Sequence, residues 1–216
     1  MTKQGYTHIL AIIDRSGSMQ SIKSDTEGGF NTYVQDQVAA PGECRFTVVQ
    51  FDNRHDLVYN DVPANQVLLY SLEPRGTTAL YDAIGWACQE LGERLAQMSE
   101  ELRPEHVVVL ILTDGYENAS TDYDSKTIRE IIQRQETDYS WTFTFLGANQ
   151  DAILTAETMG IASAAALSYT ASAAGVQGTF AAASAATTRS RSGGGYGYTD
   201  EERLAAMGGS DGGGGK

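Results

Sequence analysis

Short apolar runs typical of buried strands alternate with helical patterns along most of this 216-residue chain, and this alternation restricts the fold more than any other feature. The most apolar run, His106–Leu112, is the best candidate for a central strand. Asp56–Tyr59 follows the preceding run after only four residues, which predicts a hairpin with an edge strand. The six predicted strands are His8–Ile13, Cys44–Phe51, Asp56–Tyr59, His106–Leu112, Trp141–Leu146 and Ala166–Thr170.

Helical patterns lie between these runs. Apolar residues recur at helical spacing from Leu80 to Met98, which predicts one long amphipathic helix. Ser21–Val38 is the weakest pattern, because Gly28-Gly29 interrupts it. Further helices are expected over Ser125–Thr137, Asp151–Met159 and Ala173–Thr188. The alternation predicts an α/β fold: a doubly wound, mainly parallel six-stranded sheet with one antiparallel edge strand and helices on both faces, in a Rossmann-like arrangement.

Glycine concentrates near the carboxyl terminus, where residues 192–216 contain 10 of the 23 glycines. A segment of this composition buries too little apolar surface to offset the entropy that its backbone loses on folding. We therefore expect one domain over residues 1–191 and a Gly-rich flexible tail over residues 192–216, with a helical turn over Thr199–Met207.

The charge balance excludes two classes of partner. Lys and Arg total 15 against 28 Asp and Glu, a formal net charge of −13. Nucleic acids and anionic lipid surfaces both require clustered basic residues, so we expect neither nucleic acid nor a membrane as partner. Cys44 and Cys88 fit a reducing compartment or a single bridge, and no apolar run approaches the roughly 20 residues that span a bilayer. These features predict a cytoplasmic protein.

Side chains with oxygen atoms gather at the ends of predicted strands. Asp14, Ser16 and Ser18 follow the first strand at alternate positions, Thr78 precedes the long helix, and Asp114 follows the most apolar strand. Ligands of open α/β sheets bind beyond the carboxyl ends of the strands. Five oxygen donors with two negative charges suit Mg²⁺, whereas softer metals require Cys or His. Two carboxylates only balance the charge of the ion, which would therefore still accept an anionic oxygen from outside.

These residues resemble the metal-ion-dependent adhesion site (MIDAS) of the von Willebrand factor type A (VWA) domain. Asp14-Arg15-Ser16-Gly17-Ser18 is similar to the DxSGS motif, and Thr113-Asp114-Gly115 to the TDG turn. Thr78, which is followed by four residues and then Ala83, is similar to the threonine at the head of the third helix of the family, although Arg75-Gly76 stands where a glycine pair is common. The resemblance covers about residues 6–190.

The resemblance implies a role for each residue and a kind of partner. Ser16 and Ser18 would bind Mg²⁺ directly, with Mn²⁺ as an alternative ion. Asp14, Thr78 and Asp114 would bind it directly or through water. The last coordination position would take an Asp or Glu carboxylate from a partner protein, so the chain would be a binding module and not an enzyme. Bacterial members inside cells commonly work beside an ATPase or assembly partner, which suggests a bacterial or phage source.

Two other functions are open at this point. The chain would also suit a structural or assembly subunit of a larger particle or filament. A Mg²⁺-dependent phosphatase of the haloacid-dehalogenase type also has an aspartate after its first strand. That enzyme needs a second aspartate where this chain has Ser16, which cannot donate a proton at neutral pH. No glycine-rich phosphate-binding motif is present either.

Each motif taken alone has a simpler explanation. The segment from Asp14 to Ser18 would be a polar turn, and Thr77 or Thr78 a helix cap. Asp52 would be a hairpin carboxylate that could also approach the metal from the side. Acidic residues after the TDG turn would tune the charge near the metal or lie in a solvated loop. We expect partner specificity to come from the loops Asn53–Val62, Gly115–Asp124 and Ala148–Asp151.

Overall fold

A six-stranded sheet forms the centre of the molecule. The computed structural model describes residues 1–148 and 151–209. The order of the strands is β3-β2-β1-β4-β5-β6, in which β3 is antiparallel to β2 and every other neighbouring pair is parallel. This confirms the predicted sheet, its central strand and its antiparallel edge. The strands are β1 Lys3–Asp14, β2 Glu43–Phe51, β3 His55–Pro63, β4 Pro104–Thr113, β5 Thr142–Ala148 and β6 Ala166–Tyr169.

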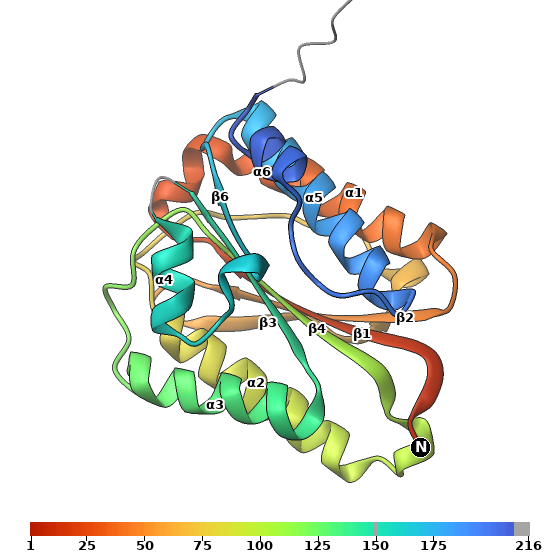
Figure 1. The fold of residues 1–216 in the computed structure, drawn as a ribbon. Coiled ribbons are helices and arrows are strands. Elements are labelled where there is room, and N and C mark those ends of the chain that lie inside the picture. The colour runs from red at the N-terminus through yellow and green to blue at the C-terminus, as the bar shows by residue number, and fades with distance from the viewer. Residues whose placement is uncertain (149–150, 210–216) are drawn as a thin grey trace, which may run out of the picture.

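Helices cover both faces of the sheet (Figure 1). One face carries α1 Lys23–Ala39, α5 Ala173–Arg191 and α6 Asp200–Ala206, and the other carries α2 Leu80–Gln97, α3 Ser125–Tyr139 and α4 Ala152–Thr158. Short 3₁₀ helices are η1 Gly17–Ile22, η2 Ala64–Gln66, η3 Glu100–Leu102 and η4 Ser163–Ala165. Throughout the described residues, every helix is too short or too polar to span a lipid bilayer.

Two apolar layers, one on each face of the sheet, form the core. Strand β1 is buried on both sides: Ile9 and Ile13 belong to the layer beneath α1 and α5, whereas Leu10 and Ile12 belong to the layer beneath α2 and α3. This pattern explains why the run lacks the apolar-polar alternation of a half-exposed strand. The two layers hold β1 and β4 rigidly, and the candidate site lies at the ends of these strands.

Helix α1 forms in spite of its two glycines. An added Cβ at Gly29 would lie 2.2 Å from Cδ2 of Phe180 on α5, so the missing side chain lets the two helices approach closely. Phe30 and Tyr33 on the same helix are fully buried. Tertiary packing therefore outweighs the poor helix propensity of the Gly-Gly pair.

The segment after α5 differs from our expectation of a flexible tail. Tyr198 is buried, and its hydroxyl lies 2.6 Å from Oγ1 of Thr144 in β5. Helix α6 begins with a capping box between Thr199 and Glu202, and Arg189 on α5 forms an ion pair with Glu202. The helical turn predicted over Thr199–Met207 is present as α6, whereas the packing of residues 196–207 differs from a flexible tail, because composition does not register these few anchoring side chains. Residues 210–216 of the predicted tail lie outside the described residues.

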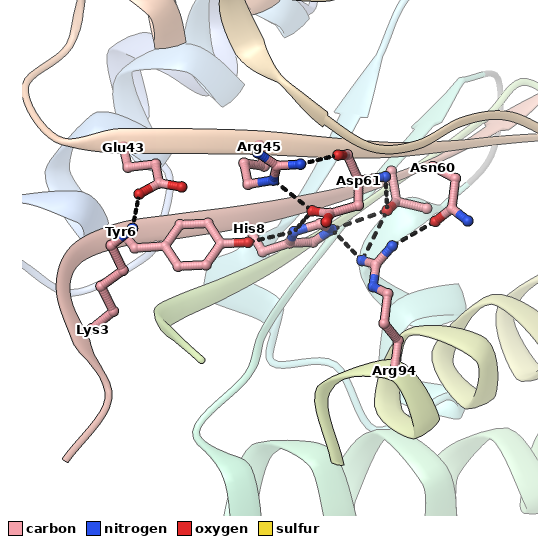
Figure 2. Close-up of polar contacts among 9 residues, drawn as sticks. Lys3, Tyr6, His8, Glu43, Arg45, Asn60, Asp61 and Arg94 are labelled. Atoms are coloured by element: carbon pink, nitrogen blue, oxygen red, sulfur yellow. Dashed lines mark hydrogen bonds and ion pairs between the residues drawn. The ribbon is translucent and has the colours of Figure 1, made fainter. Parts of the chain in front are cut away.

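One polar cluster interrupts the core on the α2 side of the sheet, near the amino-terminal half of β1 (Figure 2). His8 is fully buried, and its Nε2 lies 3.1 Å from Nη2 of Arg94 on α2. Because a guanidinium can only donate, this nitrogen accepts, and the ring proton is on Nδ1, which lies 3.6 Å from Oδ1 of Asp61. The cluster therefore holds His8 in its neutral form, next to a positive charge.

Candidate metal-binding site

The candidate residues converge where the strand order reverses. Strands β1 and β4 are neighbours in the sheet, but the chain continues from β1 to β2 on one side and from β4 to β5 on the other. Asp14 is the last residue of β1, and Thr113 is the last residue of β4. Such a switch point leaves a crevice beyond the carboxyl ends of the strands, which is the usual ligand position in this architecture.

Asp14 is fully buried and fixed at both of its oxygens. Oδ1 accepts a hydrogen bond from the backbone N–H of Ser16 at 2.6 Å, and Oδ2 accepts one from the Thr113 hydroxyl at 2.6 Å. The first bond makes the turn after β1, and the second ties β1 to β4. Thr113, which sequence reasoning treated only as part of the TDG turn, is therefore a residue that positions Asp14.

Two serines and an aspartate continue the chain of oxygens. The hydroxyls of Ser16 and Ser18 lie 3.1 Å apart, and Ser18 Oγ donates to Oδ1 of Asp114 at 2.6 Å. Ser16 is buried, Asp114 is partly buried, and Ser18 is exposed. The line of oxygens thus runs from the interior at Asp14 to the surface at Ser18.

Thr78 completes the set from the loop before α2. A Cβ on Gly115 would lie 3.3 Å from Thr78 Oγ1 and 3.6 Å from Ser18 Oγ, so both hydroxyls lie next to Gly115 and a side chain there would crowd the Thr78 hydroxyl. Thr78 is buried, whereas Thr77 is exposed, which agrees with the choice of Thr78. The structure thus brings all five predicted residues together from three separate segments.

The helix-cap explanation of the threonines does not hold. The residue before α2 is Ala79, whose side chain caps nothing. The amino end of α2 is instead capped from the loop after β4: Glu117 Oε2 accepts from the Tyr81 N–H at 3.0 Å, and Ser120 Oγ accepts from the Asp82 N–H at 3.1 Å.

Asn118 holds Thr78 in place. Its side-chain oxygen accepts from the Thr78 N–H, and its own N–H donates to the Thr78 carbonyl, both at 3.0 Å. Asp82 accepts three backbone N–H groups of residues 121–123. Glu117 and Asp82 are therefore structural acids that bind the loop to α2. Sequence reasoning missed Asn118 and Asp82, because their partners are backbone groups about 40 residues away.

Asp52 belongs to the β2–β3 hairpin, as the simpler explanation predicted. Its Oδ1 accepts from the Arg54 N–H at 2.8 Å, and its Oδ2 accepts from Nε of Arg15 at 3.1 Å and Nε of Arg75 at 2.8 Å. Although burial raises the pKa of Asp52, the hydrogen bonds and the arginine charges outweigh it and lower this pKa below its usual range. Asp52 therefore stays ionised and anchors two arginines beside the candidate site.

At the two candidate ligands, Asp14 and Asp114, burial outweighs the hydrogen bonds. It raises the pKa of Asp14 to about 6, against the hydrogen bonds from Thr113 and Ser16, and it also raises the pKa of Asp114. The charged forms of these neighbouring carboxylates are therefore disfavoured in the protein alone. A cation bound between them would favour both charged forms.

The chemistry of the donors fits a hard divalent cation. Within the described residues, no three His, Cys, Asp or Glu side chains are grouped so as to hold a metal ion. A cation here would therefore depend on the hydroxyls of Ser16, Ser18 and Thr78 in addition to two carboxylates. Such an all-oxygen set suits Mg²⁺, which keeps several water ligands and needs few protein charges.

Comparison with known proteins identifies the fold. No protein-family model matches the sequence, and no curated protein is significantly similar to it in sequence. Among solved structures, the von Willebrand factor domain of the pilus tip protein Mfa5 from Porphyromonas gingivalis aligns with a TM-score of 0.65 at 9% identity, over 87% of this chain and 96% of that one. The chain has the von Willebrand factor type A fold.

Two further VWA neighbours are longer proteins. A von Willebrand factor type A protein from Catenulispora acidiphila aligns with a TM-score of 0.59 at 15% identity, over 86% of this chain and 43% of that one. Proximal thread matrix protein 1 from the mussel byssus aligns with a TM-score of 0.58 at 16% identity, over 85% of this chain and 46% of that one. This chain thus spans less than half of either protein. Another structure of the mussel protein, with a TM-score of 0.53, has zinc in its MIDAS motif.

Proposed function

We propose that this VWA-fold protein is a protein-binding module that holds a divalent cation at Asp14, Ser16, Ser18, Thr78 and Asp114, with Mg²⁺ as the preferred ion and Mn²⁺ as an alternative. The observation that carries the proposal is the convergence of three chain segments on one set of oxygens, with Ser18 and Asp114 joined at 2.6 Å. Gly115 lies next to the hydroxyls of Ser18 and Thr78, where a side chain would crowd the Thr78 hydroxyl.

The residues of the candidate site would have different roles in holding the cation. Asp14, fixed by Thr113 and the Ser16 N–H, would present its remaining lone pairs in one orientation. The hydroxyls would complete the ligand set without adding charge. When bound, the cation balances the charges of Asp14 and Asp114 and supplies an open coordination position for an Asp or Glu carboxylate of a partner protein.

The names of the structural neighbours support binding over catalysis. They include a pilus tip protein, the pilus adhesin SpaC from Lactobacillus rhamnosus GG and a byssal matrix protein. The matrix protein also favours the second candidate, an assembly subunit, in which the metal site would join copies or neighbouring subunits. Two further points remain predictions: that the partner is an ATPase or an assembly protein, and that the protein is cytoplasmic.

A metal titration with matched variants tests the proposal. Asp114→Asn removes one charge at the site, and Asp122→Asn removes one charge from the same loop but at an exposed residue outside the set of oxygens. Calorimetry should give Mg²⁺ binding by wild type and Asp122→Asn, and at least about tenfold weaker binding by Asp114→Asn. Equal affinities for all three proteins would refute the site.

A capture experiment tests the binding function. Immobilised wild-type protein and the Asp114→Asn variant are exposed to cell extract in Mg²⁺ or in EDTA. A partner retained only by wild type in Mg²⁺, and lost when one of its own carboxylates is replaced, would support the proposal. A partner retained equally in EDTA would mean that the binding surface lies elsewhere. Assembly that dissociates in EDTA would favour the second candidate.

A further inference from the structure

We propose that the pocket beside the metal site receives a second acidic side chain of the same partner, so that the partner segment carries two carboxylates; this inference rests on the proposed function. The pocket has a volume of about 270 Å³ and is lined by Asp52, Asn53, Arg54 and Arg75. It opens from the hairpin between β2 and β3 and from the loop that leads to Thr78.

The pocket is fixed by the buried carboxylate of Asp52. Arg15 donates to this carboxylate through Nε, and its Nη2 lies 2.6 Å from an oxygen of Asp56; its side chain is only 7% exposed, so it offers little surface to a ligand. Arg75 also donates to Asp52 through Nε, but its side chain is 58% exposed. The carboxylate therefore orients Arg75 while the rest of that guanidinium faces the pocket and solvent.

Donors remain for a ligand in this pocket. Arg54 is exposed, and its side chain forms no hydrogen bond or ion pair with any described residue. Nη1 of Arg75 has no such partner among the described residues either, and its Nη2 lies 3.6 Å from an oxygen of Asp56, a loose and exposed contact. Two guanidinium groups with free N–H donors around one pocket match the planar, two-oxygen geometry of a carboxylate.

Gly76 lies between the pocket and the metal site. The Gly17 N–H donates to the Gly76 carbonyl at 3.2 Å, and the Arg75 N–H donates to the Arg15 carbonyl at 2.8 Å. Gly76 has φ of +70°, and an added Cβ there would lie 2.8 Å from Oδ1 of Asn53. The segment Arg75-Gly76 is thus bonded to the turn after β1 on one side and borders the hairpin on the other, so we expect a short extended peptide to reach both sites.

Charge complementarity selects the occupant. A protein with a net charge of −13 repels acidic segments over most of its surface. Once a cation balances the charges of Asp14 and Asp114, the arginines Arg15, Arg54 and Arg75 outnumber Asp52 and Asp56 beside the pocket, which makes this edge of the sheet locally positive. An acidic partner would therefore dock at this edge of the sheet, with one carboxylate on the cation and the other on the arginines.

Synthetic peptides test this inference on the intact protein in saturating Mg²⁺. Each peptide is acetylated and amidated and contains one aspartate, then a spacer of one to six glycines, and then Glu, Gln or Lys. The spacer extends the reach by at most about 3.5 Å per residue. At low salt, calorimetry should give about two- to fivefold tighter binding of the best Glu peptide than of the matched Gln peptide. The Lys peptide should bind more weakly than both.

Variants assign the difference to the arginines. The Arg54→Gln/Arg75→Gln double variant should lose the preference for Glu over Gln while its affinity for the Gln peptide stays unchanged. Arg134→Gln, which makes the same kind of charge change at an exposed residue of α3, should keep the preference. Asp56→Asn removes an internal competitor for Arg75 and should increase the preference.

The outcomes separate this inference from the proposed function. Metal-dependent binding of the Gln peptide, with no gain from Glu at any spacing, would refute the second carboxylate and leave the proposed function standing. A preference that survives in the double variant would refute the role of the arginines. No metal-dependent binding of any peptide, in a protein that binds no Mg²⁺, would refute the proposed function and this inference with it.

Discussion

Lowering the pH from 7 to 5 should destabilise this protein through one buried histidine. His8 is fully buried, and burial, together with the positive charge of Arg94, lowers its pKa from 6.5 to about 3. Asp61 opposes this shift, and Arg45 adds to it. Below pH 6.5 the unfolded chain therefore takes up a proton at His8 that the folded protein does not accept. The free energy of unfolding must therefore decrease as the pH decreases from 6.5.

The size of the effect follows from proton linkage. Each pH unit below the unfolded pKa costs about 1.4 kcal/mol until the folded pKa is reached. At pH 5, which is 1.5 units below 6.5, the loss is about 2 kcal/mol. Because pH 5 is well above the folded pKa of about 3, His8 stays unprotonated in the folded protein and the whole loss applies at this pH.

The assay is urea unfolding of wild type and His8→Gln at pH 7 and pH 5 without metal. Asp14, whose pKa is raised, contributes with the opposite sign in both proteins and cancels in the comparison. Wild type should lose about 2 kcal/mol more than the variant between the two pH values. If His8→Gln is too unstable, an NMR titration of the His8 ring replaces it. Equal losses, or a His8 resonance that titrates near pH 6.5, would refute the reasoning.

Three glycine and threonine variants test other parts of the structure. Thr78→Ala should weaken Mg²⁺ binding at least about tenfold in calorimetry, whereas Thr77→Ala, at an exposed neighbour, should leave it unchanged. Gly115→Ala should weaken Mg²⁺ binding by about tenfold without unfolding the protein, because its Cβ would lie 3.3 Å from the Thr78 hydroxyl; Gly28→Ala, with nothing within 4 Å, is the control. Gly178→Ala should lower the free energy of unfolding by about 1–3 kcal/mol, because its Cβ would lie 2.3 Å from a carbonyl oxygen of α6; an unchanged urea midpoint would contradict that packing.

The strands and most helices were predictable because their signals are local. The apolar run of β4 requires a buried strand, and the apolar spacing of α2 requires a helix with one buried face. The tertiary contacts of both elements agree with these local requirements. The tail was not predictable from composition. Tyr198 bonds to Thr144 in β5, and Arg189 pairs with Glu202 in α6, so these two contacts hold the segment after α5 in place. A high glycine content gives no indication of such single contacts.

From the sequence, the candidate site was predictable only as a set of residues that lie at the ends of predicted elements. Asp14 and Asp114 follow the runs that form β1 and β4, and adjacent parallel strands bring such residues together. The positions of Asn118 and Arg75 were not predictable, because they depend on backbone hydrogen bonds between loops that are distant in sequence.

Anomalous diffraction from crystals grown in Mn²⁺ tests the central claim most directly, because it locates the ion without reference to any partner. We predict one strong peak at the carboxyl ends of β1 and β4, within bonding distance of the Ser16 and Ser18 hydroxyls, and no such peak in crystals of Asp114→Asn. A wild-type map with no peak there, or with its strong peak at another group of residues, would contradict the account.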